Sequence, residues 1–167
     1  MVVLCIFLVI ACFYDYGSYR IPNVLLLVMI PMGVIHRMVT EGIGGILSFL
    51  IAFSIMLAVL YPFFKIGGIG AGDVKLLSIC GGYFSGNQVF LFLFFSLLVA
   101  AIFSIIKLLN EGSAKERFGY LGEYLYQVAR TGNWYLYVED FKEMHSGTLC
   151  FSGPVLISVL MHMGGVY

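Results

Sequence analysis

Residues 89–109 read VFLFLFFSLLVAAIFSIIKLL, an apolar run in which Lys107 is the single charged residue. A helix of this length rises roughly 30 Å, which matches the hydrocarbon core of a bilayer. A helix that is apolar on every face is either buried in a large protein or surrounded by lipid. The segment therefore predicts a membrane-spanning helix and an integral membrane protein.

The composition of the whole chain agrees with this prediction. Of its 167 residues 61% are hydrophobic and 11% are charged, and the mean hydropathy is +1.01. Soluble domains carry about 45–50% apolar and about 25% charged residues. Lys and Arg number 9 and Asp and Glu also number 9, so the chain lacks the positive field of a nucleic-acid-binding protein. We expect the lipid bilayer as a partner, and no nucleic acid.

Five further apolar stretches predict an all-α, polytopic fold with about six transmembrane helices in a single domain over residues 1–167. The fourth stretch covers only about 16 Å as a helix, so it is either a span or a recessed helix. Pro31 predicts a kink in the second stretch. The six stretches are Met1–Tyr14, Val24–Val39, Ile43–Phe64, Val74–Phe84, Val89–Leu109 and Leu149–Met163.

The basic residues predict the orientation of these helices. With the N-terminus outside and six crossings, eight of the nine Lys and Arg lie on the inner side, and Arg37 alone lies outside. Such an asymmetry is typical of cytoplasmic loops. No Lys or Arg precedes Arg20, so we interpret Met1–Tyr14 as a retained helix rather than a cleaved signal peptide.

Residues 110–148, between the fifth and sixth stretches, form the one long polar segment. Phe118, Leu121, Leu125 and Val128 recur at the spacing of one helix face. We expect a cytoplasmic or interfacial amphipathic segment, which either connects two spans or contacts a substrate. The four cysteines and three histidines show no ligand spacing, so we expect no metal and no cofactor.

Acidic residues are rare outside that segment and comprise Asp15, Glu41 and Asp73. Asp15 ends the first stretch and Asp73 begins the fourth, so the predicted topology places both at the inner membrane edge. Ionisable groups in such positions are costly and are candidates for function. Two carboxylates that share one proton can hydrolyse a peptide, one as general base and the other as proton donor. The sequence leaves the assignment of these two roles open.

Each aspartate lies in a distinctive local sequence. Residues 15–23 read DYGSYRIPN and residues 67–75 read GGIGAGDVK. We expect Pro22 in the first turn of the second helix, and Asn23 bonded to backbone freed near that entry. Asp73 is expected at the N-cap of the fourth helix, after a flexible glycine-rich turn. Lys75 is either an anchor at the inner surface or a group that acts on Asp73 or substrate.

These motifs resemble the type IV prepilin peptidases, G-x-G-D aspartyl proteases of bacterial and archaeal membranes. The resemblance rests on Asp15 with R-I-P-N at residues 20–23, on G-A-G-D-V-K at residues 70–75, and on G-P at residues 153–154. It implies that Asp15 and Asp73 are catalytic at the cytoplasmic face of the inner membrane, on prepilin-like precursors with short basic leaders. The supporting motif residues are Arg20, Pro22, Asn23, Gly70, Gly72 and Lys75.

The chain also differs from the larger members of this family, which carry a cytoplasmic domain with paired cysteines and N-methylate the new terminus. Nothing in this sequence matches that domain, so we expect peptidase activity without methylation. The size resembles the compact branch that acts on Flp or Tad pilins or on archaeal preflagellins. Two alternatives are a presenilin-like protease and a small proton-coupled carrier or channel subunit with Asp15 and Asp73 as a relay.

Overall fold

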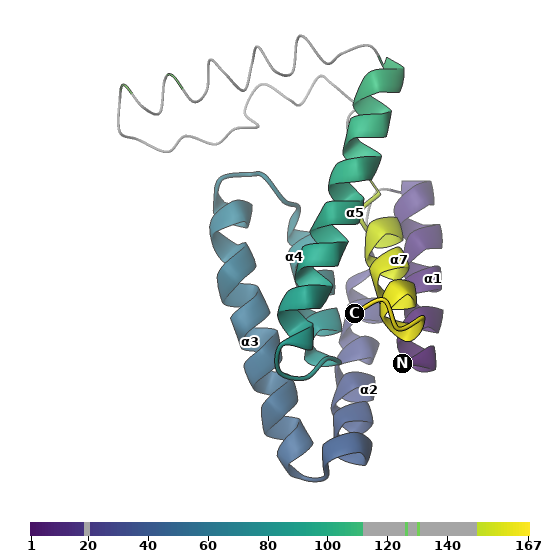
Figure 1. Cartoon of the computed structure of the whole chain (residues 1–167), viewed down its shortest axis with the longest axis vertical. Coiled ribbons are helices and arrows are strands. Elements are labelled where there is room, and N and C mark those ends of the chain that lie inside the picture. Colours follow the sequence, from purple (N-terminus) through teal and green to yellow (C-terminus); the bar gives the residue numbers. More distant parts are fainter. Residues whose placement is uncertain (19–20, 112–125, 127–129, 131–149) are drawn as a thin grey trace.

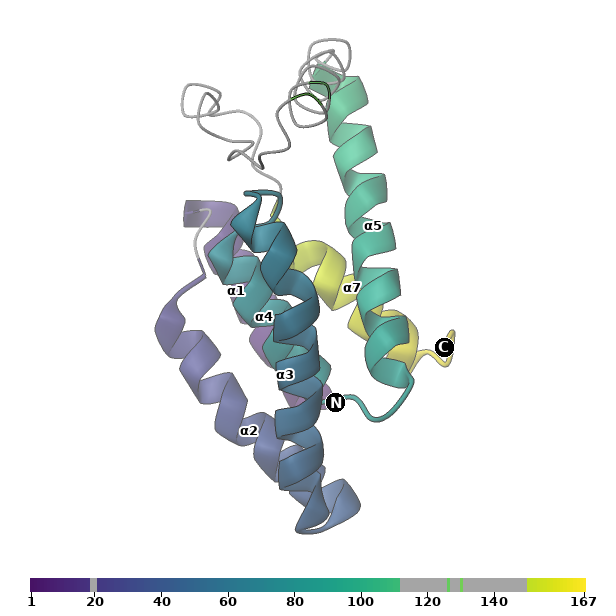
Figure 2. The same cartoon turned by 90° about the vertical axis from the view of Figure 1, so that its left-hand side faces the viewer.

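The computed structural model describes residues 1–18, 21–111, 126, 130 and 150–167. These residues form a bundle of α-helices, shown from two sides in Figures 1 and 2, and no strand occurs among them. The expected all-α fold is confirmed for this part of the chain. The helices are α1 (Val2–Ser18), α2 (Asn23–Glu41), α3 (Gly44–Lys65), α4 (Ala71–Gly82), α5 (Gln88–Glu111) and α7 (Ser152–Met163).

Within the described residues, three helices are long and apolar enough to cross a membrane, namely α2, α3 and α5 as far as Asn110. The shorter helices α1 and α7 are also apolar. Large apolar side chains on α1, α2, α3 and α5 face outward, as lipid-facing side chains do. The structure therefore supports a membrane protein, whereas six complete crossings stay a prediction.

Helix α4 forms the centre of the bundle. It contacts α2, α3, α5 and α7, and every residue from Leu76 to Gly82 is buried. Twelve residues rise about 18 Å, so α4 is short for a span and is surrounded by protein instead of lipid. The tyrosine that follows it, Tyr83, donates a hydrogen bond to the carbonyl of Met29 at 2.8 Å and so joins α4 to α2.

Several predicted boundaries shift in the structure. Helix α1 continues past Tyr14 to Ser18, so Asp15 lies inside its last turn rather than after it. Pro31 lies within α2, which runs as one helix on both sides of it. The last helix begins at Ser152. The expected amphipathic segment falls almost entirely on residues 112–149, which with two exceptions lie outside the described part of the chain.

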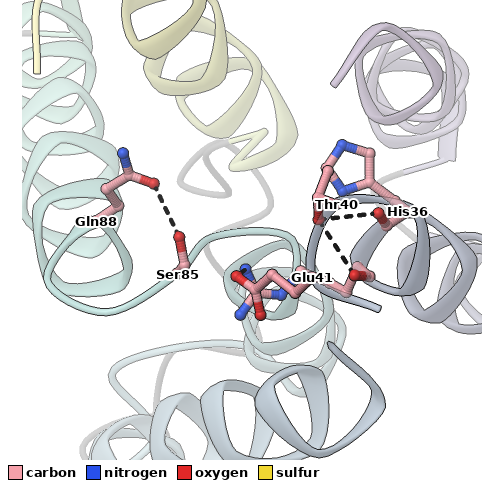
Figure 3. Close-up of polar contacts among 6 residues, drawn as sticks. His36, Thr40, Glu41, Ser85 and Gln88 are labelled. Atoms are coloured by element: carbon pink, nitrogen blue, oxygen red, sulfur yellow. Dashed lines mark hydrogen bonds and ion pairs between the residues drawn. The ribbon is translucent and has the colours of Figure 1, made fainter. Parts of the chain in front are cut away.

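Arg37, the one basic residue predicted on the outer side, forms an ion pair within its own helix. It is 4% exposed and pairs with Glu41 one turn further along α2. Figure 3 shows this end of the bundle, where Thr40 donates to the carbonyl of His36 at 3.1 Å and Ser85 to Gln88 at 3.5 Å. The Arg37 charge is thus balanced inside the bundle, and the predicted orientation of the helices stays a prediction.

The turn between α2 and α3 brings two backbones into contact. Gly42 ends α2 with φ of 71°, a conformation that glycine adopts without strain. A Cβ on Gly45 would approach the carbonyl oxygen of Arg37 within 2.1 Å, whereas a Cβ on Gly44 would meet nothing within 4 Å. Helices in membranes use small residues in this way to pack closely.

We predict that Gly45→Ala destabilises the protein by about 1–3 kcal/mol, because backbone must move to admit the methyl group. The adjacent Gly44→Ala is the matched control and is expected to be neutral or slightly stabilising. Thermal unfolding of the two variants in detergent measures the difference. Equal stability of the two variants would contradict the close approach of α2 and α3.

Candidate active site

The two predicted aspartates lie at the same end of the bundle. Helix α1 ends and α4 begins at the end where α5 extends beyond its neighbours (Figure 1). Asp15 is in the last turn of α1 and Asp73 is in the first turn of α4. The charge of Asp15 acts on the carboxyl of Asp73. Two helices from different parts of the sequence thus bring together the only two acids predicted to form a pair.

The Asp15 carboxylate is buried, at 6% exposure, against the start of α7. Its Oδ2 atom accepts a bond from the backbone N–H of Ser152 at 3.2 Å and a second from the Ser152 hydroxyl at 2.6 Å. The Cys150 thiol donates to the Asp15 carbonyl at 3.6 Å. A carboxylate at a helix N-terminus meets unpaired N–H groups and the positive end of the helix dipole.

Ser152 is a site residue that the sequence did not predict. Gly153 and Pro154 marked the start of the last helix, because proline is favoured in a first turn. That local signal locates the exposed N–H groups of α7. It does not reveal which acid accepts their hydrogen bonds, since Asp15 lies 137 residues away in the sequence.

Asp73 is not the N-cap of α4, which corrects the expectation from the sequence. Gly70 holds that position with extended backbone, and Asp73 is the third residue of the helix. Its carboxylate accepts a hydrogen bond from the Gly70 backbone N–H, as an acidic third residue does in a capping box. A Cβ on Gly70 would lie 3.0 Å from Asp73 Oδ2, so glycine leaves room for this carboxylate.

The pKa of Asp73 is raised from its ordinary value of 3.8 to about 6. Burial is the largest cause, the negative charge of Asp15 is the second, and the Gly70 hydrogen bond opposes them. The first turn of α4 lies outside the long apolar helices. A carboxyl group that retains a proton near neutral pH can donate it to a substrate.

Three of the supporting residues lie at the starts of α4 and α2. Lys75 Nζ donates to Asn23 Oδ1 at 3.3 Å and links the starts of α4 and α2. The Asn23 side chain thus accepts a hydrogen bond from the Lys75 side chain, whereas the sequence predicted a bond to backbone. Pro22 precedes α2 as its N-cap residue, one position before the predicted one, and its carbonyl accepts the N–H of Leu25 at 3.0 Å.

Gly72 has no packing role that requires glycine, and Arg20 cannot be compared with the pair. A Cβ on Gly72 would meet no atom within 4 Å, so no close approach requires glycine there. Arg20 lies outside the described residues. Among the residues that are described, no three His, Cys, Asp or Glu side chains are grouped as metal ligands are.

A mainly apolar groove of about 570 Å³ lies beside this site, between α1, α5 and α7. Ser152 lines it and is bonded to Asp15, so the groove leads to the buried carboxylate. A second cavity of about 320 Å³ lies beside Arg37 and Glu41 and contains neither aspartate. The apolar groove is lined by Val9, Phe13, Phe103, Lys107, Ser152 and Leu156 together with five other residues.

Comparison with known families identifies the class of protein. The type IV leader peptidase family matches residues 2–105, which contain α1 to α4, most of α5 and both aspartates. The chain belongs to this family. No curated protein and no solved structure matched the chain. Ser152 and α7 lie beyond the matched residues.

We predict that Asp73→Asn stabilises the protein above pH 6 while it removes a candidate catalytic group. Because the folded-state pKa is above the ordinary value, ionisation opposes folding, and wild type loses stability as the pH rises from about 4 to 6. The neutral variant avoids this loss, which amounts to about 1–3 kcal/mol at pH 7.5.

Unfolding in detergent at pH 4.5 and 7.5 tests this prediction. The stability difference should favour Asp73→Asn at both pH values and should be clearly smaller at pH 4.5, where the folded protein still binds the Asp73 proton, than at pH 7.5. A variant that is less stable than wild type at pH 7.5 would contradict the raised pKa of Asp73.

Proposed function

We propose that this protein is a membrane aspartyl endopeptidase that removes the short basic leader peptide from prepilin-like precursors at the cytoplasmic membrane face. One observation carries the proposal. Carboxylates from α1 and α4 interact at one end of the bundle, in a chain of the leader peptidase family. A raised pKa beside a second acid, at the end of a groove, is typical of catalytic carboxyls.

The proposed reaction is hydrolysis by one water molecule, with one proton shared between Asp15 and Asp73. The ionised carboxylate takes a proton from water as the oxygen attacks the scissile carbonyl. The protonated carboxyl donates its proton to the carbonyl oxygen. When the tetrahedral intermediate collapses, one of its hydroxyl groups returns a proton to the carboxylate that had donated it. The C–N bond breaks, and the leaving nitrogen receives the proton that came from water. No cofactor takes part in these steps.

The positions of the basic residues support a cytoplasmic site. Lys65 ends α3, Lys75 follows Asp73 on α4, and Lys107 lies near the end of α5. All three are therefore at the same end of the bundle as the aspartates, where the positive-inside rule places the cytoplasm. We propose that the protein resides in the inner membrane of a bacterium or archaeon.

The groove between α1, α5 and α7 supports a particular mode of substrate binding. Its lining is mainly apolar and it ends at Ser152, next to Asp15. We assign it to the apolar segment that follows the cleavage site, so that the scissile bond reaches the carboxylates. The basic leader then extends toward the cytoplasm.

The arrangement of the acids argues against the carrier alternative. A proton relay requires groups along a path through the bilayer, and carrier sites lie near the midplane. Asp15 and Asp73 instead occupy helix ends on one side of the bundle. We also propose that the new terminus leaves without N-methylation, because no part of residues 1–167 resembles the paired-cysteine domain of the larger family members.

Asp15→Asn and Asp73→Asn are each expected to reduce precursor cleavage by at least about a thousandfold, because a dyad needs both carboxyls. Purified protein in detergent is mixed with a leader-bearing precursor, and mass spectrometry follows the shortened product and its free, unmethylated amine. Glu41→Gln, at the opposite end of the bundle, is the control and should retain activity. Cleavage retained by either aspartate variant would exclude the mechanism.

Filling the groove is expected to weaken substrate binding. We predict that Val9→Trp raises KM at least about fivefold for a precursor with its apolar segment, and much less for a short peptide that lacks it. Ile10→Trp is the matched control, because Ile10 is the next residue of α1 and does not line the groove. An equal effect of the two substitutions would contradict the assignment of the groove.

A further inference from the structure

Ser152 makes two hydrogen bonds to one carboxylate oxygen. It is fully buried, it is the first residue of α7, and both its N–H and its hydroxyl reach Asp15 Oδ2. The hydroxyl bond of 2.6 Å has the short length of a bond to a charged acceptor. Among the described residues, Asp73 receives a hydrogen bond from the single backbone N–H of Gly70.

This geometry distinguishes the two aspartates. A backbone N–H can donate but cannot accept a hydrogen bond, so Oδ2 must act as an acceptor toward Ser152. A proton on Oδ2 would compete with both donors, and the N-terminus of α7 adds an electrostatic preference for the anion. When one proton is shared by the pair, these donors direct it to Asp73.

We propose that Ser152 is a positioning residue that holds Asp15 as the ionised, water-activating member of the pair and leaves Asp73 as the proton donor. This inference rests on the proposed peptidase function. It also assigns the two roles that the sequence left open. Because Ser152 lines the groove as well, the residue that fixes the base lies where the apolar segment of the substrate is proposed to end.

Other ionisable groups near Asp15 must be considered in a test by pH. Cys12 of α1 interacts with both Ser152 and Asp15, and Cys150, before α7, contacts the Asp15 carbonyl. Asp73 faces Asp15 from α4. Lys107 of α5 acts on Cys150. The burial of the two thiols raises their pKa values, so they stay uncharged in the experiment, and the substitutions change neither Asp73 nor Lys107.

The kinetic test compares Ser152→Ala, Ser152→Thr and Ser158→Ala. We expect Ser152→Ala to lower kcat about 10- to 100-fold with KM changed less than about twofold, because the base is less well fixed. The acid limb of its kcat/KM profile should move up by about one pH unit, since the carboxylate loses a donor. Ser152→Thr keeps the hydroxyl and should recover most of the activity.

Ser158 is the matched control, because it is also a fully buried serine of α7 and its hydroxyl donates to the Phe92 carbonyl at 3.3 Å. Ser158→Ala should leave the pH profile unchanged, whatever its effect on stability. An unshifted acid limb in Ser152→Ala, or an equal shift in Ser158→Ala, would overturn the proposed role of Ser152.

A measurement that needs no substrate separates this inference from the proposed function. NMR of protein labelled with ¹³C at the Asp carboxyl groups follows Asp15, with Asp15→Asn for assignment. The Asp15 carboxyl signal should shift in Ser152→Ala relative to wild type, because the carboxylate loses a hydrogen-bond donor, and should stay in place in Ser158→Ala. If this shift occurs without any precursor cleavage by wild type, Ser152 keeps its role toward Asp15 and the peptidase proposal fails. No shift overturns the inference even if cleavage occurs.

Discussion

A buried negative charge at the end of α1 is the constraint on which the site depends. The surface of the bundle is largely apolar, so the Asp15 carboxylate must be stabilised by groups inside the protein. The N-terminus of α7 provides the two donors of Ser152, and the last described helix is thereby tied to the first. The same charge lies near Asp73 and discourages its ionisation. One interaction therefore connects packing, protonation and the proposed chemistry.

Helix α4 brings the second acid to this charge. It has only twelve residues and is buried from Leu76 onward, while its first turn carries Asp73 at the end of the bundle. Lys75 and Asn23 join this turn to the start of α2. A central helix surrounded by others holds its first residues more firmly than a surface loop would. Rigid placement of both carboxyls is what a shared proton and an oriented water require.

The sequence predicted the helical membrane fold and both aspartates because their signals are strong and local. Residues 89–109 can hardly be anything but an apolar helix, and Asp15 and Asp73 stand out where acids are rare. The missed features depend on contacts between distant residues. Ser152 bonds to Asp15, and Lys75 bonds to Asn23. Each hydrogen bond joins two helices that are far apart in the sequence, so no local sequence pattern predicts it.

The prediction that Asp73 is the N-cap of α4 was wrong for a similar reason. Glycine and aspartate are both favoured near a helix start, and sequence propensity alone did not show that Gly70 holds the N-cap position and Asp73 the third helical position. The close approach of Gly45 to the Arg37 carbonyl was also outside the reach of the sequence, since Gly44 beside it has open space. Local composition predicted where the turns lie. The packing of the helices determined which residue of each turn caps the helix or allows the close approach.

Precursor cleavage in water enriched with ¹⁸O tests most directly whether the protein cuts the precursor by hydrolysis, because one oxygen of the new carboxylate then comes from water. The account predicts that purified wild-type protein releases a leader whose new carboxylate carries one ¹⁸O atom after a single turnover, and a pilin fragment with an unlabelled, free amine. Folded protein that cuts no leader-bearing precursor, or a leader without the label, would contradict it.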